Sequence, residues 1–275
     1  MVTLDEAPSP HNRKAAPTMT ARVHEIRSEI SWSTASKITV FGHDLVHDLV
    51  GNVNLGDMGF LELTGRRPDP AESAMFNALT VSLVEHGMTP SAIATRLTHY
   101  GSPESLQGAV AAGLLGLGST FVGSIEGAAR YIQEASPEGS PDVEAAKIVD
   151  RHVSAHTPIP GIGHPIHKPV DPRAERLFTL LHENGLEGPQ TALIREVARQ
   201  AGVALGKELP VNVTGAIGAI ASLLGIDWRA ARGIGVMARA VGLVGHVLEE
   251  IRSPTAPTVW REVEEAVTNH HKPAE

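Results

Sequence analysis

The residues best suited to chemistry lie in one loop, residues 159–174, which reads IPGIGHPIHKPVDPRA. Pro160 and Pro172 stiffen this loop, while Gly161 and Gly163 allow its backbone to approach a ligand closely and to expose N–H groups. Side-chain donors stand beside these N–H groups: His164, His167, Lys168 and Arg173. Such a set of donors favours an anionic ligand that carries a carbonyl oxygen. The alternative is a turn-rich linker between two layers of helices.

Two further pairs of histidines stand four residues apart on expected helices, His43 with His47 and His152 with His156. Either pair could contribute two ligands to a zinc ion. Neither pair has an obvious third ligand, and neither belongs to an H-E-x-x-H pattern. We therefore expect surface or capping histidines and no metal site.

The elements that must position the loop are almost all helical, because apolar residues recur at three- and four-residue spacing and prolines follow capping residues. A short strand is expected at Lys37–Phe41, and the Pro-rich stretch Thr157–Pro172 cannot be a regular helix. The expected helices are a short one near 43–50, and then 71–86, 91–99, 104–117, 119–134, 143–156, 171–184, 191–205, 213–224, 228–251 and 258–269.

One of these helices, Glu104–Leu117, is apolar nearly all round, which predicts that it is buried. Its Ala- and Gly-rich part, Gly108–Gly118, could instead form a dimer interface. Small residues allow helices of two subunits to approach closely.

Composition limits the class of protein. The chain has 275 residues, of which 42% are hydrophobic, so a substantial core can form. A net charge of −8 argues against a nucleic-acid-binding protein, and the lack of cysteine excludes disulfides, thiolate metal sites and a cysteine nucleophile. No Walker pattern is present and no G-x-G-x-x-G follows a strand, so neither ATP nor NAD is expected. Without a signal-peptide core or an apolar stretch long enough for a bilayer, we expect a soluble cytoplasmic protein with no membrane partner.

The loop also carries a recognisable signature. PGIGHPIHKPVDPRA resembles the pattern of the citrate synthase superfamily, P-G-x-G-H followed at the right spacing by D-P-R-A. Further similar segments keep the family's order along the chain and extend the resemblance over about residues 35–252: ITVFGHDLVHDLVG, SLVEHGMTPSAIATRL and ARAVGLVGHVLEE. Because full citrate synthases are longer, the chain is most similar to stand-alone citryl-CoA lyase and to the lyase module of ATP-citrate lyase.

The resemblance implies an all-α, citrate-synthase-like fold in which a large and a small helical domain close over a cleft. We expect the large domain to comprise residues 21–164 and 225–275, the small domain residues 165–224, and a flexible tail residues 1–20. The resemblance also implies a homodimer or a dimer of dimers. It implies no permanently bound cofactor, and a coenzyme A thioester with a tricarboxylate or oxo acid as the substrate.

The resemblance assigns roles residue by residue. His164 matches the histidine that hydrogen-bonds the oxaloacetate carbonyl or citrate hydroxyl, and His86 matches one that helps to bind the four-carbon acid. Arg173 and Arg239 match arginines that hold substrate carboxylates, and Arg252 matches the arginine that a neighbouring subunit contributes. The residues implied for coenzyme A are Pro160, Gly161, Ile162 and Gly163 at the adenine end and Lys168 near the phosphates.

Three further positions are expected to contact substrate. Phe121 stands where citrate synthases have the histidine that polarises the thioester carbonyl, and the lyase module of ATP-citrate lyase also has Phe there. Thr214 replaces the aspartate that moves the methyl proton of acetyl-CoA, and a threonine hydroxyl is too weakly acidic to act as a base near neutral pH. His246 lies on an otherwise apolar helix face, which is typical of a core histidine, whereas the resemblance places it in the cleft.

We therefore expect a carbon–carbon lyase that cleaves citryl-CoA to acetyl-CoA and oxaloacetate. His164 could accept the hydroxyl proton and assist the forming carbonyl, while protonation of the departing enolate would need water, Glu126 or His246. Two alternatives stay open: condensation of an acyl-CoA with an oxo acid, as in citrate or methylcitrate synthase, and a non-catalytic relative that still binds coenzyme A. Phe121 and Thr214 count against condensation, and Thr214 supports the non-catalytic alternative.

Overall fold

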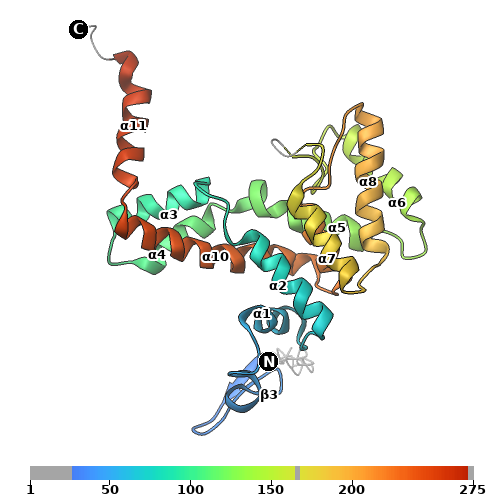
Figure 1. Ribbon diagram of the computed structural model, residues 1–275, viewed down its shortest axis with the longest axis horizontal. Coiled ribbons are helices and arrows are strands. Elements are labelled where there is room, and N and C mark those ends of the chain that lie inside the picture. Colours follow the sequence, from blue (N-terminus) through green and yellow to red (C-terminus); the bar gives the residue numbers. More distant parts are fainter. Residues whose placement is uncertain (1–26, 165–167, 272–275) are drawn as a thin grey trace, which may run out of the picture.

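The computed structural model describes residues 27–164 and 168–271, and these ranges contain eleven α-helices and a small antiparallel sheet (Figure 1). The all-α class is confirmed. The expected flexible tail, residues 1–20, and His167 lie outside the described residues. The helices are α1 (Leu55–Thr64), α2 (Pro70–Val84), α3 (Pro90–Gly101), α4 (Leu106–Leu115), α5 (Gly123–Glu134), α6 (Pro141–Ser154), α7 (Pro172–Glu183), α8 (Pro189–Leu205), α9 (Val213–Leu223), α10 (Trp228–Arg252) and α11 (Ala256–Thr268).

Most helices begin where proline and capping residues predict. Thr89, for example, caps α3 by accepting a backbone hydrogen bond in the first turn. Helices α6, α8 and α11 begin two residues before the expected positions, and two other starts differ for identifiable reasons. The helix expected from Glu104 begins at Leu106, because the Ser105 side chain provides the cap. The helix expected from residue 119 opens with a π-helical turn, η2 (Gly118–Val122), which leads directly into α5.

Helix α1 is not predicted by the apolar pattern. Its sequence, LGDMGFLELT, buries only Phe60 and Leu61, so the repeat is too weak to detect. The signals that could have identified it are at its ends. Asn54 caps the start by accepting the Asp57 N–H, and Gly65, with a φ of 72°, ends the helix in a left-handed conformation.

A small sheet precedes α1. Strands β1 (Ser31–Ser33), β2 (Ile38–Val40) and β3 (His43–Asp44) pair antiparallel in that order, so the predicted strand is confirmed as the middle of three. The short helix expected near residues 43–50 is a π-helical turn, η1 (Leu45–Leu49). The sheet, this turn and α1 form a separate small core from Val40, Leu49 and Leu61.

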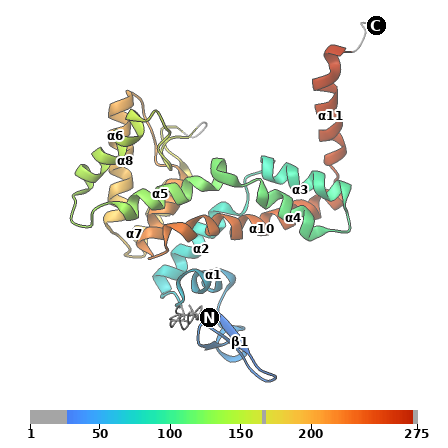
Figure 2. The ribbon, with the colours of Figure 1, turned by 180° about the vertical axis from the view of Figure 1, so that it is seen from behind.

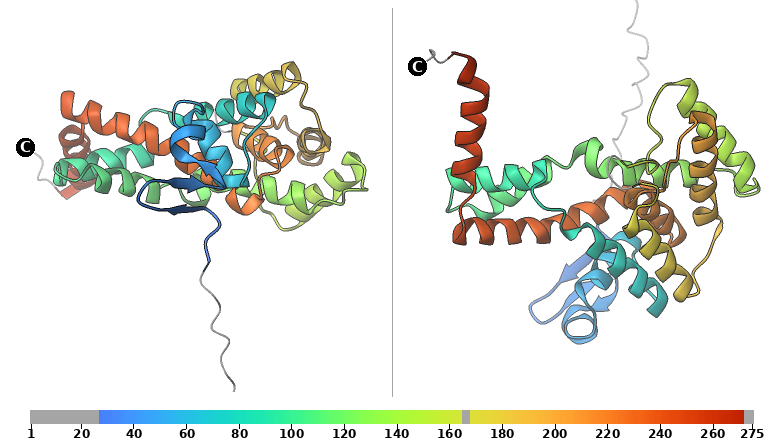
Figure 3. Two further views of the ribbon diagram at one scale, coloured as in Figure 1. Left: turned by 90° about the horizontal axis from the view of Figure 1, so that it is seen from below. Right: turned by 45° about the horizontal axis from the view of Figure 1, so that its top comes forward.

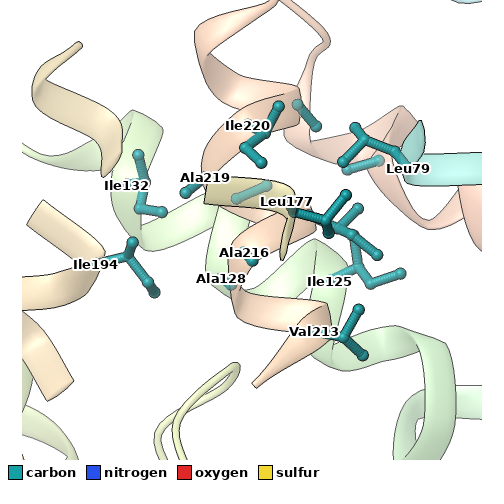
Figure 4. Close-up of a cluster of buried hydrophobic side chains, with 14 of the residues drawn as sticks. Leu79, Ile125, Ala128, Ile132, Leu177, Ile194, Val213, Ala216, Ala219 and Ile220 are labelled. Carbon is teal, nitrogen blue, oxygen red and sulfur yellow. The ribbon is translucent and has the colours of Figure 1, made fainter. Parts of the chain in front are cut away.

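Helix α9 lies at the centre of the main hydrophobic core, where α5, α7 and α8 surround it (Figure 4). Nine of its eleven residues are buried. Its small residues allow α5 to approach closely: a Cβ placed on Gly218 would lie 2.8 Å from the Cβ of Ala128. Because α9 is so tightly enclosed, the residues at its start, Asn212–Thr214, are held in a fixed place.

We call the helices packed around α9 the body of the molecule. The long helix α10 extends from this body and packs with α3 and α4 to form an arm (Figures 1 and 2). Helix α11 projects from the end of the arm (Figure 3). The burial predicted for α4 is wrong for a single chain: only Ala109 and Gly113 are buried, and Leu115 is 86% exposed. Other large apolar side chains of the arm and of α11 are also exposed: Leu97, Leu106, Val244, Leu248, Ile251, Trp260, Val263 and Val267.

The two-domain division stays a prediction. Helix α6 falls within the range expected for the large domain, yet it packs on α8, which falls within the range expected for the small domain. Helices α5 and α9 likewise pack together across the expected boundary. Residues from both ranges therefore share one core in this structure.

Candidate active site

A cavity of about 410 Å³ lies where several helix ends of the body meet. It is lined from the end of α2, the turn η2, the loop at residues 163–164, the starts of α7 and α9, and the middle of α10. The cavity brings together seven of the predicted site residues: His86, Phe121, Gly163, His164, Arg173, Thr214 and Arg239. The other six described site residues do not line it: Pro160, Gly161, Ile162, Lys168, His246 and Arg252.

Arg173 is held by the buried carboxylate of Asp171. The Oδ1 of Asp171 accepts from the Arg173 backbone N–H at 3.0 Å and from Nε at 3.1 Å, and Oδ2 accepts from Nη2 at 3.0 Å. Oδ2 also accepts the backbone N–H of Val213 at 2.9 Å, which ties the start of α7 to the start of α9. Burial would raise the pKa of Asp171, but the hydrogen bonds from Arg173 and Val213 outweigh it and hold this pKa below its ordinary value. Asp171 is therefore charged near neutral pH and fixes the guanidinium of Arg173 at the cavity.

Arg239 reaches the cavity from α10 without such a partner. Its Nε and Nη1 atoms are buried, and among the described residues neither has a hydrogen-bond acceptor. Burial lowers the pKa of Arg239, and the Glu85 carboxylate opposes this shift. Because a buried guanidinium without acceptors is costly, a ligand carboxylate is the group that would satisfy it.

The loop before His164 is fastened to α5 and α9 through its own backbone. Gly161 donates its N–H to the Ser124 hydroxyl at 2.8 Å and accepts the Asn212 N–H at 3.0 Å, while Gly163 donates to a backbone carbonyl at 2.7 Å. Gly161 also touches Gly215, where an added Cβ would lie 2.3 Å from the Gly161 carbonyl oxygen. The expectation that these glycines offer N–H groups to a ligand is therefore wrong, because both groups are used inside the protein. Their role is the close approach that sets His164 at the cavity.

One wall of the cavity is formed by the side chains of Ser124, Asn212 and Thr214. The Thr214 Oγ1 lies 2.6 Å from the Asn212 Oδ1 and 3.1 Å from the Ser124 Oγ. Asn212 is itself fixed, because its Nδ2 donates to the Gly163 carbonyl at 2.7 Å and its Oδ1 accepts the Gly215 N–H at 3.1 Å. These hydroxyl groups cannot act as a base near neutral pH, in agreement with the substitution noted in the sequence.

His246 lies outside the cavity, contrary to the expected contact with substrate. Its Nδ1 is 3.0 Å from the Nε of buried Arg96, and its Nε2 is 3.1 Å from the Oε1 of Glu85. Because an arginine can only donate, Nδ1 is the acceptor and Nε2 carries the proton that points to Glu85. The same Glu85 oxygen accepts the backbone N–H groups of His86 and Gly87. His246 is therefore linked to the segment that carries His86 through the Glu85 carboxylate.

The remaining predicted contacts are not tested by this geometry. Lys168 and Arg252 are exposed, Arg252 at the end of α10 in the arm. The Pro160 carbonyl accepts the hydroxyl of Tyr131 at 3.0 Å. The coenzyme A contacts of residues 160–163 and Lys168, and the contribution of Arg252 to a neighbouring subunit, stay predictions. The second proton donor considered from the sequence, Glu126, does not line the cavity and pairs with another arginine of α10.

Sequence reasoning missed three residues that shape the site: Ser124, Asp171 and Asn212. Ser124 follows Phe121 by three residues, which places the two on one face of a helix. Asp171 is the first residue of the D-P-R-A motif, and Asn212 directly precedes α9 as its cap. Each signal was present in the sequence, but only the folded chain brings the three together.

Within residues 27–164 and 168–271, no group of three His, Asp or Glu side chains is arranged to hold a metal ion. In the same ranges no single helix is long and apolar enough to cross a membrane. One bent pair, residues 106–115 with 118–134, meets the criteria of length and composition.

Comparison with known families places the whole chain rather than single residues. The family model described as the citrate synthase C-terminal domain matches residues 14–261. The chain belongs to the citrate synthase family. In structure this family member is similar to the citryl-CoA lyase of Hydrogenobacter thermophilus, with 37% identity and a TM-score of 0.78 over 85% of this chain and 90% of that one.

Longer proteins are also similar. The citrate synthase of Acidithiobacillus ferridurans is 29% identical over 196 residues, which make up 69% of this chain but 50% of that protein, so the chain spans about half the length of this relative. A structure of ATP citrate lyase from Methanothrix soehngenii, in complex with citrate and coenzyme A, has a TM-score of 0.69 at 22% identity. It covers 92% of this chain and 44% of that one, and it supports the fold.

Proposed function

We propose that the protein is a citryl-CoA lyase, which cleaves citryl-CoA to acetyl-CoA and oxaloacetate. The observation that carries the proposal is Arg239, whose buried Nε and Nη1 have no acceptor among the described residues, in a cavity that Arg173, His86 and His164 also line. Two guanidinium groups and two imidazoles suit a ligand with several carboxylates and a hydroxyl or carbonyl oxygen. Similarity to a citryl-CoA lyase over most of both chains supports the choice of substrate.

Each group has a part in the cleavage. Arg173 and Arg239 hold the carboxylates of the four-carbon half, which aligns the bond to be broken. His164 takes the proton of the citryl hydroxyl, and the oxygen forms the new carbonyl of oxaloacetate as the carbon–carbon bond breaks. The electron pair of that bond passes to the acetyl half, which leaves as the enolate of acetyl-CoA. The enolate carbon then takes up one proton, so the reaction is balanced without an oxidant or a cofactor.

In the described residues, the wall at Thr214 presents hydroxyl and amide groups and no carboxylate for the first step of condensation. Condensation begins with removal of a methyl proton from acetyl-CoA, which needs a positioned base. The hydroxyl groups of Thr214 and Ser124 are not bases near neutral pH. Cleavage forms the enolate directly from the broken bond, and an enolate is basic enough to take its proton from water.

The proposed enzyme is a homodimer whose subunits meet through the arm. Leu115, Leu248 and Ile251 are exposed on one end of the molecule, and a large apolar surface of this kind is typical of an interface. The small residues of α4 would allow close contact with a second copy, and Arg252 lies on the same arm. Light scattering after size exclusion should give twice the 29.1 kDa chain mass, and Leu115→Lys should give the single-chain mass. A wild-type protein that stays monomeric would contradict this part of the proposal.

The activity is tested with purified protein and citryl-CoA, with oxaloacetate measured through malate dehydrogenase and NADH oxidation. Wild-type protein should oxidise NADH continuously, and His164→Ala should slow the reaction by about 100-fold or more because the acid–base group is lost. His152→Ala is the control, since His152 lies outside the cavity and contacts Thr157. Wild-type protein that leaves citryl-CoA intact would refute the proposal.

A further inference from the structure

The proposed cleavage places negative charge on the thioester oxygen, and the cavity needs a donor for it. As the bond breaks, the acetyl half becomes an enolate, and hydrogen-bond donors aimed at such an oxygen usually supply a large part of catalysis. Phe121 cannot donate. A hydroxyl group beside it in the cavity, that of Ser124, is suited to this role.

The hydroxyl protons of the wall can be assigned from their partners. Asn212 Oδ1 carries no hydrogen, so the Thr214 hydroxyl, 2.6 Å away, donates to it. The Ser124 oxygen already accepts the N–H of Gly161 at 2.8 Å. Among residues 27–164 and 168–271, the one acceptor left beside the Ser124 proton is the Thr214 oxygen at 3.1 Å, which is long for a hydrogen bond between hydroxyls. This proton can turn to a ligand oxygen at little cost.

Ser124 also stands in the right place along the chain. It follows Phe121 by three residues on the helical segment formed by η2 and α5, and both side chains line the cavity. It is partly buried, and the Gly161 hydrogen bond holds its oxygen in position. A donor fixed in advance in this way loses little energy in reorganisation when charge develops.

We infer that the Ser124 hydroxyl donates a hydrogen bond to the thioester carbonyl oxygen of the bound substrate and stabilises the enolate formed on cleavage. The inference rests on the proposed lyase function. No covalent bond to Ser124 forms, and its proton stays on the serine oxygen throughout. Thr214 contributes as an acceptor, which keeps the Ser124 proton directed into the wall before substrate binds.

The direct test is the infrared carbonyl stretch of acetyl-CoA labelled with ¹³C at the thioester carbon. Binding to wild-type protein should lower the wavenumber of this stretch relative to free acetyl-CoA, because a hydrogen bond weakens the C=O bond. Ser124→Ala should lose the shift, and in the citryl-CoA assay it should lose about 100-fold in kcat with little change in KM. Ser124→Thr should retain both properties.

Two further variants separate a donor from a structural role. Ser124→Ala also removes the acceptor of the Gly161 N–H, so a disturbed loop could alter binding. Thr214→Val removes the competing acceptor but keeps the Ser124 donor, and it should retain the carbonyl shift. Ser222→Ala removes a buried hydroxyl of α9 that bonds to Gly218 away from the cavity, and it should retain the shift and the activity.

The outcomes distinguish the two claims. If wild-type protein cleaves citryl-CoA and Ser124→Ala keeps both the shift and kcat, the role of Ser124 is refuted while the lyase function stands. If wild-type protein shows a shift that depends on Ser124 but leaves citryl-CoA intact, the lyase function is refuted while the contact with the thioester is supported. An unshifted carbonyl in the wild-type complex, or no binding of acetyl-CoA, refutes the role of Ser124.

Discussion

Replacing Arg239 with methionine should stabilise the protein and weaken its binding of substrate at the same time. Nε and Nη1 of Arg239 are buried and find no acceptor within residues 27–164 and 168–271, so the ligand-free protein bears a desolvation cost for this cation. Methionine has a similar length and needs no hydrogen bond. Stability should rise and substrate affinity should fall for the same reason: the Arg239 cation is left for the ligand carboxylate to pair with.

The magnitudes follow from the groups involved. Relief of a buried unsatisfied polar group gains about 1 kcal/mol or more, which raises the Tm of a domain of this size by about 2 to 4 °C. Loss of a two-point hydrogen bond between guanidinium and carboxylate costs about 3 kcal/mol, or about 100-fold in Kd. We therefore expect Arg239→Met to melt higher than wild-type protein without ligand and to gain far less from added oxaloacetate.

Differential scanning calorimetry and titration calorimetry with oxaloacetate measure both quantities. Arg229→Met is the matched control on the same helix, since the Nε of Arg229 donates to the Asp227 Oδ1 at 2.9 Å outside the cavity. It should leave the Kd unchanged and lower the Tm slightly, as expected for an exposed ion pair. An Arg239→Met protein that melts lower than wild type, or that binds oxaloacetate equally well, would refute the reasoning.

Three other substitutions test the positioning of the site. The pKa of Asp171 lies below its ordinary value, so the stability that its charged form contributes is present above about pH 4 and is lost as the pH falls through the folded-state pKa. Asp171→Asn should lower the free energy of unfolding by about 2 to 3 kcal/mol at pH 7 and should reduce the loss of stability at acid pH in denaturant titrations. An unchanged pH profile would contradict the hydrogen bonding of Asp171 to Arg173 and Val213. Gly215→Ala should destabilise by about 3 kcal/mol because its Cβ meets the Gly161 carbonyl oxygen. Gly233→Ala in α10 should stabilise by about 0.5 to 1 kcal/mol, because its Cβ would make only an ordinary contact with Leu63, at 3.8 Å; equal melting temperatures would contradict this packing. His246→Ala should cost about 2 kcal/mol and raise the KM for citryl-CoA, because Arg96 loses a buried acceptor; a changed kcat alone would instead indicate direct contact with substrate.

The helices were predictable because their signals are local. Thr89 and Pro90 mark the start of α3, and apolar residues recur at helical spacing through most of the chain. The apolar pattern of α4 predicted a buried helix, and this prediction is wrong for the single chain because, among the described residues, no neighbouring helix covers the side of α4 that carries Leu115. Helix α1 was not predicted because two internal glycines weaken its apolar repeat.

The site was predictable where a motif carries it and unpredictable where long-range contacts decide it. The loop motif led to His164 and Arg173, which the fold places in one cavity with Arg239. The Gly161 N–H donates to Ser124, which is 37 residues away in sequence, so the spacing of residues along the chain could not predict this hydrogen bond. The place of His246 depends likewise on Arg96, a contact between residues 150 positions apart.

The central claim, cleavage of the carbon–carbon bond of citryl-CoA, is tested most directly by counting products. Citryl-CoA is incubated with the protein, and all coenzyme A species and acids are quantified by chromatography and mass spectrometry. We expect one acetyl-CoA and one oxaloacetate for each citryl-CoA consumed. Citrate and free coenzyme A in equal amounts would show hydrolysis of the thioester instead, and that result would contradict the account.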